Sequence, residues 1–302
     1  MKELELIHWI AERAPSAAGL ATGIGDDCAV LDCPGGGCVV VTTDMLLEGT
    51  HFSADDLPED VGYKAVAVSI SDVAAMGCRS LHAFLAVGLP AVADSALARG
   101  LFDGAVAAAN RFGVSLAGGD TTRSPGGLSI CSTLVGAPPE GRTPILRSGA
   151  RPGQALAVTG DLGGSLSGHH LRFVPRQTEA LQLVEEYAVG GMIDLSDGLS
   201  SDAWHLARMS GVRLRLFADR IPISPRASAA DPLGAALNDG EDFELLFTVA
   251  SEECARLSGA GLAGTPITII GEVLAGTPGV TLVDSSGRET DLKAGGYEHF
   301  SR

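Results

Sequence analysis

The spacing of apolar residues predicts three helices in the N-terminal part of the chain. Apolar side chains recur on one side of residues 3–13, which end just before Pro15, and of residues 59–76. Residues 93–112 are rich in alanine, have the length of a helix and stop at Gly113, a residue type common at helix C-termini. We therefore expect these three segments to be helical.

Short apolar runs bounded by glycine, proline and aspartate alternate with these helices and predict strands. In the N-terminal half the runs are residues 29–32, 39–43, 81–89, 114–117 and 128–137, with a loop at 118–122. In the C-terminal half they are residues 154–158, 192–193, 212–217, 243–249, 267–272 and 280–283, with helices expected at 199–209 and from 160–165 onward. The alternation indicates α/β architecture in both halves.

The chain has 302 residues, enough for two domains of ordinary size. Proline and glycine concentrate between residues 138 and 153, a composition typical of a domain junction. The sequence therefore predicts an N-terminal domain over residues 1–140 and a C-terminal domain over residues 141–302.

The charge balance is strongly acidic, with a formal net charge of −16. Nucleic acids and anionic membrane surfaces attract clusters of Lys and Arg, so we expect neither as a partner. No run of about 18 uncharged apolar residues occurs, and the amphipathic start of the chain lacks the apolar core of a secretion signal. A cytoplasmic location is expected, and most of the six cysteines, none in a CxxC pair, are interpreted as small apolar residues.

Five short segments run from apolar residues into aspartate, usually beside glycine, serine or threonine. Their acids are Asp26, Asp27, Asp44, Asp72, Asp120, Asp194 and Asp197. One such aspartate alone is more typical of a helix cap or a tight turn than of a site. Five segments together, at the expected ends of strands or helices, suit several divalent cations, because magnesium binds oxygen ligands and bridges to substrate phosphates. The pattern therefore indicates phosphate chemistry assisted by metal ions.

The common nucleotide-binding loops are absent from the sequence. None of its three lysines, at positions 2, 64 and 293, follows glycine, so there is no Walker A loop. Gly23 and Gly25 are followed by two acids where a dinucleotide would place its phosphate, which favours a metal site over a direct phosphate cradle. The hydrolase signatures GxSxG and HExxH do not occur either.

Three further residues allow two interpretations each. His51 follows an irregular stretch after Asp44 and, taken alone, is more typical of a hydrogen-bonded loop histidine than of a site. Arg147, next to the expected junction, could reach a nucleotide phosphate by bidentate contacts or lie on the surface. Glu241 precedes an apolar strand, where a simple exposed acid is the alternative.

Taken in order along the chain, these motifs resemble the thiamine-monophosphate kinase family. The resemblance covers nearly the whole chain and is carried by residues 23–29, 42–44 with His51 and Phe52, 63–77, 118–122, 147–150, 193–199, 240–245 and 296–300. It implies a two-domain α/β fold with mixed sheets, of the aminoimidazole-ribonucleotide-synthetase-like ATP-binding superfamily. In that fold the N-terminal domain binds ATP and magnesium and pairs with its copy in a homodimer.

The resemblance also implies an activity: ATP-dependent phosphorylation of thiamine monophosphate to thiamine diphosphate by in-line transfer, assisted by several Mg²⁺ ions. Asp44, Asp72 and Asp120 would be the catalytic groups. The implied metal ligands are Asp27, Thr42, Thr43, Asp44, Asp72, Asp120, Asp194 and Asp197. ATP would be contacted by Phe102, Gly119, Asp120, Arg147 and Ser196, and the thiamine phosphate by His51, Glu241 and Tyr297.

The chain departs from the family pattern in two places. Residues 168–192 are shorter than expected, as if a helix were missing, and Asp239-Gly240 replaces the usual Gly-Gly before Glu241. Two alternatives are therefore kept open. One is another ATP-using enzyme of the superfamily, such as selenophosphate synthetase or a hydrogenase-maturation dehydratase, and the other is a non-catalytic nucleotide- or metal-binding module.

Overall fold

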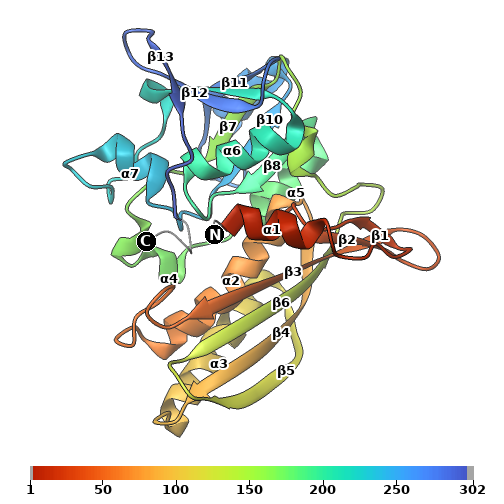
Figure 1. Cartoon of the computed structure of the whole chain (residues 1–302), viewed down its shortest axis with the longest axis vertical. Coiled ribbons are helices and arrows are strands. Elements are labelled where there is room, and N and C mark those ends of the chain that lie inside the picture. The colour runs from red at the N-terminus through yellow and green to blue at the C-terminus, as the bar shows by residue number, and fades with distance from the viewer. Residues whose placement is uncertain (1–2, 298–302) are drawn as a thin grey trace.

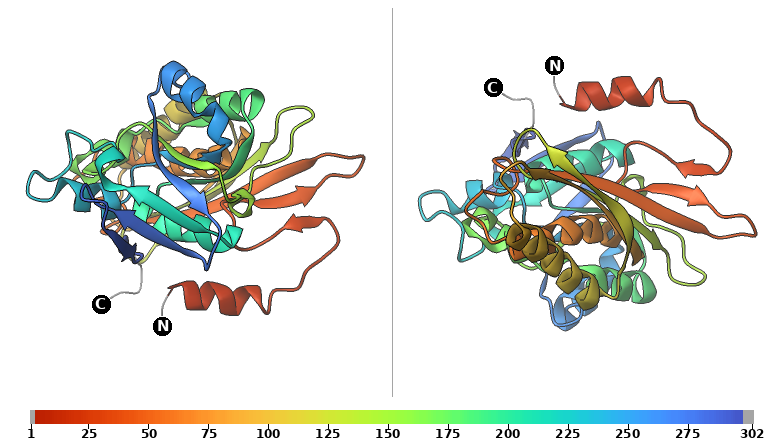
Figure 2. Two further views of the ribbon diagram at one scale, coloured as in Figure 1. Left: turned by 90° about the horizontal axis from the view of Figure 1, so that it is seen from above. Right: turned by 90° about the horizontal axis from the view of Figure 1, so that it is seen from below.

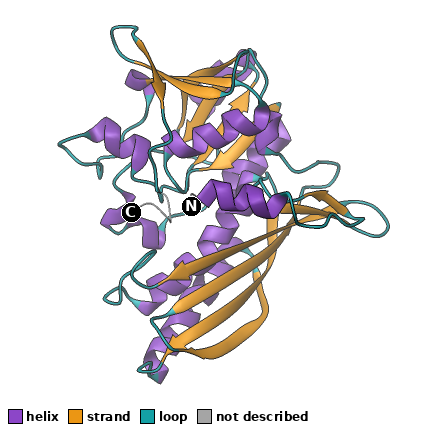
Figure 3. Ribbon diagram, in the orientation of Figure 1, coloured by secondary structure: helices purple, strands orange, loops and turns teal. Residues whose placement is uncertain are grey.

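The computed structural model describes residues 3–297 and contains two β-sheets with a long helix, α2, between them (Figure 1). The strands of the first sheet lie within residues 20–137 and those of the second within residues 155–292. Helix α1 (Glu3–Ala11) stands apart from the first sheet, on the side opposite to its covering helices (Figure 2). The colouring of Figure 3 separates these layers of helices and strands.

The first sheet has six strands and one covered face. Its order is β1 (Leu20–Thr22), β2 (Ala29–Asp32), β3 (Cys38–Leu47), β6 (Ser129–Ala137), β4 (Arg79–Pro90) and β5 (Ser115–Ser124), with only β4 and β5 parallel. Residues of β6 alternate between buried and partly buried, as expected when one face is packed. Helix α2 (Pro58–Ala75) packs on that covered face, with α3 (Ser95–Phe112) alongside. We call the other side the open face.

The second sheet is covered on both faces over much of its width. Its order is β13 (Glu289–Leu292), β12 (Gly279–Val283), β9 (Arg213–Phe217), β11 (Ile267–Leu274), β7 (Ala155–Thr159), β10 (Leu245–Val249) and β8 (Val189–Asp194). Alternate residues of β7 enter two different apolar clusters. One cluster includes side chains of α6 (Leu199–Ser210) and α7 (Pro232–Asn238), and the other includes side chains of α5 (Gln177–Glu186) and α8 (Cys254–Ala260). The four strands that contribute to both clusters, β11, β7, β10 and β8, are nearly fully apolar because of this double burial.

Two aromatic residues from the C-terminal half complete the core of the first sheet. Phe173, just after α4 (His169–Arg172), stacks on Phe243 with ring centroids 4.0 Å apart, and both belong to the N-terminal apolar cluster. The Tyr63 hydroxyl of α2 donates to the Phe173 carbonyl oxygen at 3.0 Å. The predicted domain boundary between residues 140 and 141 falls between the strands of the two sheets. It stays a prediction, because the N-terminal apolar cluster contains residues from both sides of this boundary.

The pattern-based helices at 3–13, 59–76 and 93–112 are confirmed as α1, α2 and α3. The loop predicted at 118–122 is wrong, because β5 runs through it. A Cβ at Gly119 would lie 1.8 Å from the Leu85 carbonyl oxygen, so the glycine permits close pairing with β4 rather than a turn. Residues 168–192 contain α4 and α5. Within residues 3–297 no helix is both long and apolar enough to cross a membrane.

Candidate active site

Three aspartates from different elements meet between the two sheets. Asp27 precedes β2, Asp72 lies in α2 and Asp194 ends β8, and their carboxylate oxygens lie within 4.8 Å of one another. Asp27 and Asp194 are buried, and Asp72 is partly buried. We call these three residues the acidic cluster. Asp44, on the covered face of β3, adds to the negative charge that Asp72 experiences.

Hydroxyl groups orient the carboxylates of this region. Thr42 donates to Asp72 at 2.5 Å, and Ser71 of α2 donates to Asp194 at 2.6 Å. Ser69, also on α2, donates to the fourth acid, Asp44, at 2.6 Å. Helix α2 therefore fixes acids of both sheets from one rigid element.

The electrostatics of the acidic cluster are unfavourable in the absence of a cation. Burial and neighbouring carboxylates raise the pKa of Asp194 to about 7 and that of Asp72 well above its usual range. Burial likewise raises the pKa of Asp44 to about 6. Neighbouring carboxyl groups with raised pKa values, here Asp194, Asp72 and Asp44, are typical of functional sites.

Arg147 supplies a positive charge next to the acidic cluster. Its Nη2 donates to Asp27 Oδ1 at 2.5 Å, and its backbone N–H donates to Asp26 at 3.2 Å. Burial opposes the charged form of the guanidinium, but Asp27, Asp26 and Asp194 together more than compensate, so the pKa of Arg147 is raised overall. Arg147 thus lies beside the acids and not on the surface.

The acidic cluster fits divalent metal ions. The Oδ2 atom of Asp27 is buried and has no hydrogen-bond partner among the described residues. An orphaned carboxylate oxygen inside a group of acids is the arrangement that a cation satisfies. All the possible metal ligands in the acidic cluster are oxygen atoms. Magnesium prefers oxygen ligands, whereas zinc is usually bound by nitrogen and sulfur.

A cavity of about 650 Å³ adjoins this region. Its lining includes Arg147, Ser196, Asp197, Tyr297 and His205. Asp197, Asp202 and His205 form a second group whose potential ligand atoms lie within 4.8 Å of one another. Asp202 accepts from the backbone N–H groups of Asp197 and Gly198 at 3.2 and 3.1 Å, so part of this group serves the start of α6.

Four of the residues expected to bind metal or ATP lie away from both the acidic cluster and the cavity. Thr43 and Asp120 are exposed on the open face of the first sheet, whereas Thr42 and Asp44 face α2. Gly119 is in β5, the edge strand, and Phe102 is a partly buried residue of α3 that packs against the N-terminal core. Within one chain the structure does not bring these residues to the cluster.

The three residues expected near the thiamine phosphate are divided between two places. His51 and Glu241 are linked through Lys64, whose Nζ donates to the His51 carbonyl oxygen at 2.7 Å and forms an ion pair with Glu241. Tyr297 instead lines the cavity, and its backbone N–H donates to the Asp197 carbonyl oxygen at 3.1 Å.

Sequence reasoning missed several residues that the structure brings to the site. Ser69 and Ser71 orient acids, Lys64 links His51 to Glu241, and His205 lines the cavity. Lys64 could have been recognised from the sequence, because it is the one charged residue within the apolar stretch 61–68. The serines carried no signal beyond their place beside Asp72.

Comparisons with known proteins agree with this architecture. The model of the "AIR synthase related protein, N-terminal domain" family matches residues 25–137. Thiamine-monophosphate kinases of Rhodopirellula baltica and Escherichia coli K12 are each 38% identical to the chain, over 91% and 92% of it and 90% and 92% of their own lengths.

Solved structures show the same relationship. The structure described as "AaThiL complexed with AMPPCP and TMP" matches 99% of this chain and 97% of its own, with a TM-score of 0.84 and 29% identity. The hydrogenase maturation protein HypE matches with a TM-score of 0.74 at 19% identity, which shows a shared fold alone. Given the two relatives at 38% identity over nine-tenths of their length, this chain belongs to the thiamine-monophosphate kinase family.

Proposed function

We propose that this chain transfers the γ-phosphoryl group of ATP to thiamine monophosphate at the acidic cluster, with magnesium ions held by its carboxylates. The observation that carries the proposal is the convergence of Asp27, Asp72 and Asp194 beside Arg147, with a buried Asp27 oxygen lacking a partner among the described residues. The proposed metal ligands are Asp27, Thr42, Asp44, Asp72, Asp194 and Asp197.

Charge explains why the carboxylates need metal ions. Both substrates are polyanions, and two unit charges about 4 Å apart interact by about 4 kcal/mol at an effective dielectric constant of about 20. Bound magnesium ions supply the neutralisation of phosphate charge that phosphoryl transfer requires. The hydroxyls of Thr42, Ser69 and Ser71 hold the carboxylates in place while this charge builds up.

The remaining groups bind and orient the substrates. Arg147 presents a guanidinium at the cluster and Ser196 lies at the cavity wall, which supports the proposal that both contact ATP phosphates. His51, Glu241 and Tyr297 would contact the thiamine phosphate. A phosphate monoester is largely ionised near pH 7, because its second pKa is about 6. The attacking oxygen therefore needs no general base, and positioning supplies much of the rate.

A coupled ADP-release assay with ATP, magnesium and thiamine monophosphate tests the proposal. Asp72→Asn keeps an acceptor for Thr42 but loses a charged ligand, so we expect kcat/KM to fall on the order of 100-fold. The control is Asp219→Asn, which removes an exposed acid and should change nothing. Near wild-type turnover of Asp72→Asn at saturating magnesium would refute the assignment.

The same assay separates the two alternatives. ADP released only with an acceptor other than thiamine monophosphate would indicate a related superfamily enzyme. Retained ATP binding with no ADP release would indicate a non-catalytic module. A cytoplasmic location stays a prediction.

We also propose that two copies pair through the open face of the first sheet. Met45, Leu47 and Phe84 lie on this face, with exposed fractions of 60%, 39% and 38%, and apolar patches of this kind mark interfaces. Asp120 lies on this face too. Its strand is three positions from that of Asp44 in the sheet, which corresponds to about 14 Å for a spacing of about 4.8 Å between strands. We therefore propose that Asp120 acts in the site of the second copy. Light scattering should give twice the mass of one chain.

A further inference from the structure

Lys64 is a buried cation in the middle of an apolar helix. Its side chain is 1% exposed and stands first by volume among the fully buried side chains of the described residues. The neighbouring residues of α2, from Val61 to Val68, are otherwise apolar apart from Tyr63. Lysine is almost never fully buried unless it is paired, so the contacts of Nζ must account for its place.

Nζ has two contacts that come from opposite halves of the chain. It donates to the backbone carbonyl oxygen of His51 at 2.7 Å, in the connection between β3 and α2. It also forms an ion pair with the Oε2 atom of Glu241, which follows α7 in the C-terminal half. Burial lowers the pKa of Lys64, and the Glu241 carboxylate opposes that shift.

The backbone around Glu241 is fixed in an uncommon conformation. Glu241 has φ 56° and Phe243 has φ 51°, both in the left-handed region, which costs on the order of 1 kcal/mol or more for each residue that is not glycine. Their N–H groups donate to the carbonyl oxygens of Ser196 at 2.7 Å and Leu195 at 2.8 Å. This loop is therefore held against the segment that carries Asp194 and Ser196, and Lys64 fixes the remaining freedom of the Glu241 side chain.

We propose that Lys64 is a positioning residue for the second substrate: anchored on the His51 carbonyl, its ammonium aims the Glu241 carboxylate into the thiamine phosphate site. The inference rests on the proposed function, because it takes Glu241 as a contact of that substrate. Nζ contacts Oε2, so we expect the Oε1 atom to face the ligand and to attract its positive charge. Thiamine carries a permanently cationic thiazolium ring, and a carboxylate with a fixed direction suits such a ligand.

The main test compares two variants that each lose the cation of an ion pair between α2 and the C-terminal half. Lys64→Met keeps the length of the side chain and removes its charge. We expect its KM for thiamine monophosphate to rise at least tenfold, with KM for ATP within twofold of wild type. The matched control is Arg172→Met, which loses a more exposed ion pair. Its partner, Asp60, lies on α2 one turn away from Lys64. The control should change neither KM.

A second variant guards against a folding defect. Lys64→Met leaves the Glu241 carboxylate unpaired, which can destabilise the protein, so thermal unfolding is measured alongside. Lys64→Met combined with Glu241→Gln leaves no unpaired charge. If Lys64 acts through Glu241, this double variant should differ from Glu241→Gln alone by less than threefold in KM for thiamine monophosphate.

The outcomes are distinct. The inference is overturned if folded Lys64→Met keeps a wild-type KM for thiamine monophosphate, or if KM for ATP rises equally, as a purely structural role would require. It is also overturned if the double variant loses much more than Glu241→Gln. If the wild-type protein releases no ADP with thiamine monophosphate, the proposed function fails, and this inference fails with it.

Discussion

Replacing Asp194 by Asn should stabilise the metal-free protein while abolishing its activity. Asp194 ends β8 inside the acidic cluster, and burial together with Asp27 raises its pKa from 3.8 to about 7. Because the folded-state pKa lies above the unfolded one, the native state binds more protons between these values, and stability falls as pH rises through this window. Asn has the shape of Asp, can still accept from Ser71, and carries no charge to bury.

The magnitude follows from the two pKa values. At about 1.4 kcal/mol per pKa unit, burying Asp194 costs the fold about 4 kcal/mol at pH 8, where the buried group is ionised, and about 2 kcal/mol at pH 5.5, where it takes up a proton on folding. The gain from Asp194→Asn should therefore be about twice as large at pH 8. For a chain of this size it corresponds to an increase in Tm of roughly 5–10 °C at pH 8.

The assay is thermal unfolding in EDTA at both pH values, with Asp219→Asn as a control for removing one acid from a protein of net charge −16. Added magnesium should raise the Tm of the wild type at pH 8 more than that of Asp194→Asn, because bound ligand stabilises the native state. A folded Asp194→Asn variant that melts at or below the wild-type temperature in EDTA at pH 8 would refute the reasoning.

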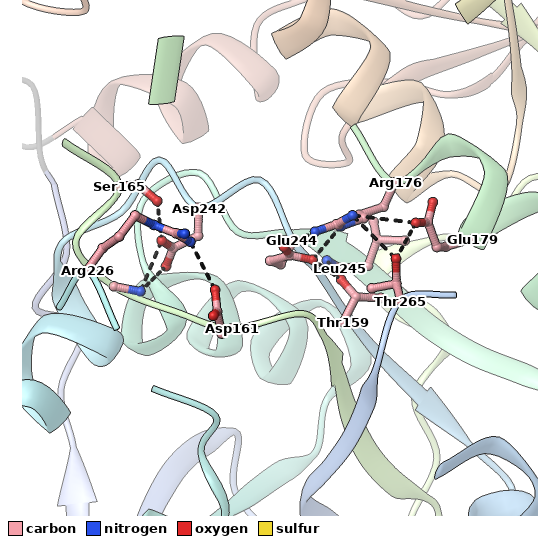
Figure 4. Close-up of polar contacts among 11 residues, drawn as sticks. Thr159, Asp161, Ser165, Arg176, Glu179, Arg226, Asp242, Glu244, Leu245 and Thr265 are labelled. Carbon is pink, nitrogen blue, oxygen red and sulfur yellow. Dashed lines mark hydrogen bonds and ion pairs between the residues drawn. The ribbon is translucent and has the colours of Figure 1, made fainter. Parts of the chain in front are cut away.

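Two further predictions concern stability and assembly. Arg176 pairs with Glu244 and Glu179, whose side chains are only 4% and 7% exposed (Figure 4), so Arg176→Met should cost about 3–5 kcal/mol of unfolding free energy in urea. The exposed Arg226–Asp161 pair is the control, and Arg226→Met should cost at most about 1 kcal/mol; equal losses would contradict this. Phe84→Asp, on the open face, should give single chains by light scattering, and a persisting dimer would exclude that face as the interface.

Local pattern predicted much of the N-terminal fold, because α2 and α3 are long and their apolar residues are regularly spaced. The short helices α5, α7 and α8 went unpredicted: their 7 to 10 residues are stabilised by tertiary packing more than by local preference. The sequence predicts a loop in the middle of strand β5, because Gly118 and Gly119 are typical of a turn when only neighbours in sequence are considered.

The acids of the candidate site were predicted, but not the reason for their convergence. They were expected at the ends of strands and helices, and of the five segments only Asp194 ends a strand. Asp44, Asp72 and Asp120 lie inside elements, so their meeting depends on how α2 lies between the sheets. The face of β3 or β5 on which a residue lies depends on strand register and curvature, which local sequence does not determine. The sequence therefore does not predict that Asp120 and Asp44 lie on opposite faces of the sheet.

Helix α2 restricts how the two halves of the chain can move relative to each other. A single rod holds Asp44 of the first sheet through Ser69, Asp194 of the second through Ser71, and the Glu241 loop through Lys64. It also lies against α3 at glycine contacts, where a Cβ on Gly62 would come within 1.8 Å of the Leu101 carbonyl oxygen. The two halves therefore cannot swing apart like a hinge without breaking the site. Substrates therefore have to enter without a hinge motion between the two halves, and the floor of the site stays in one piece.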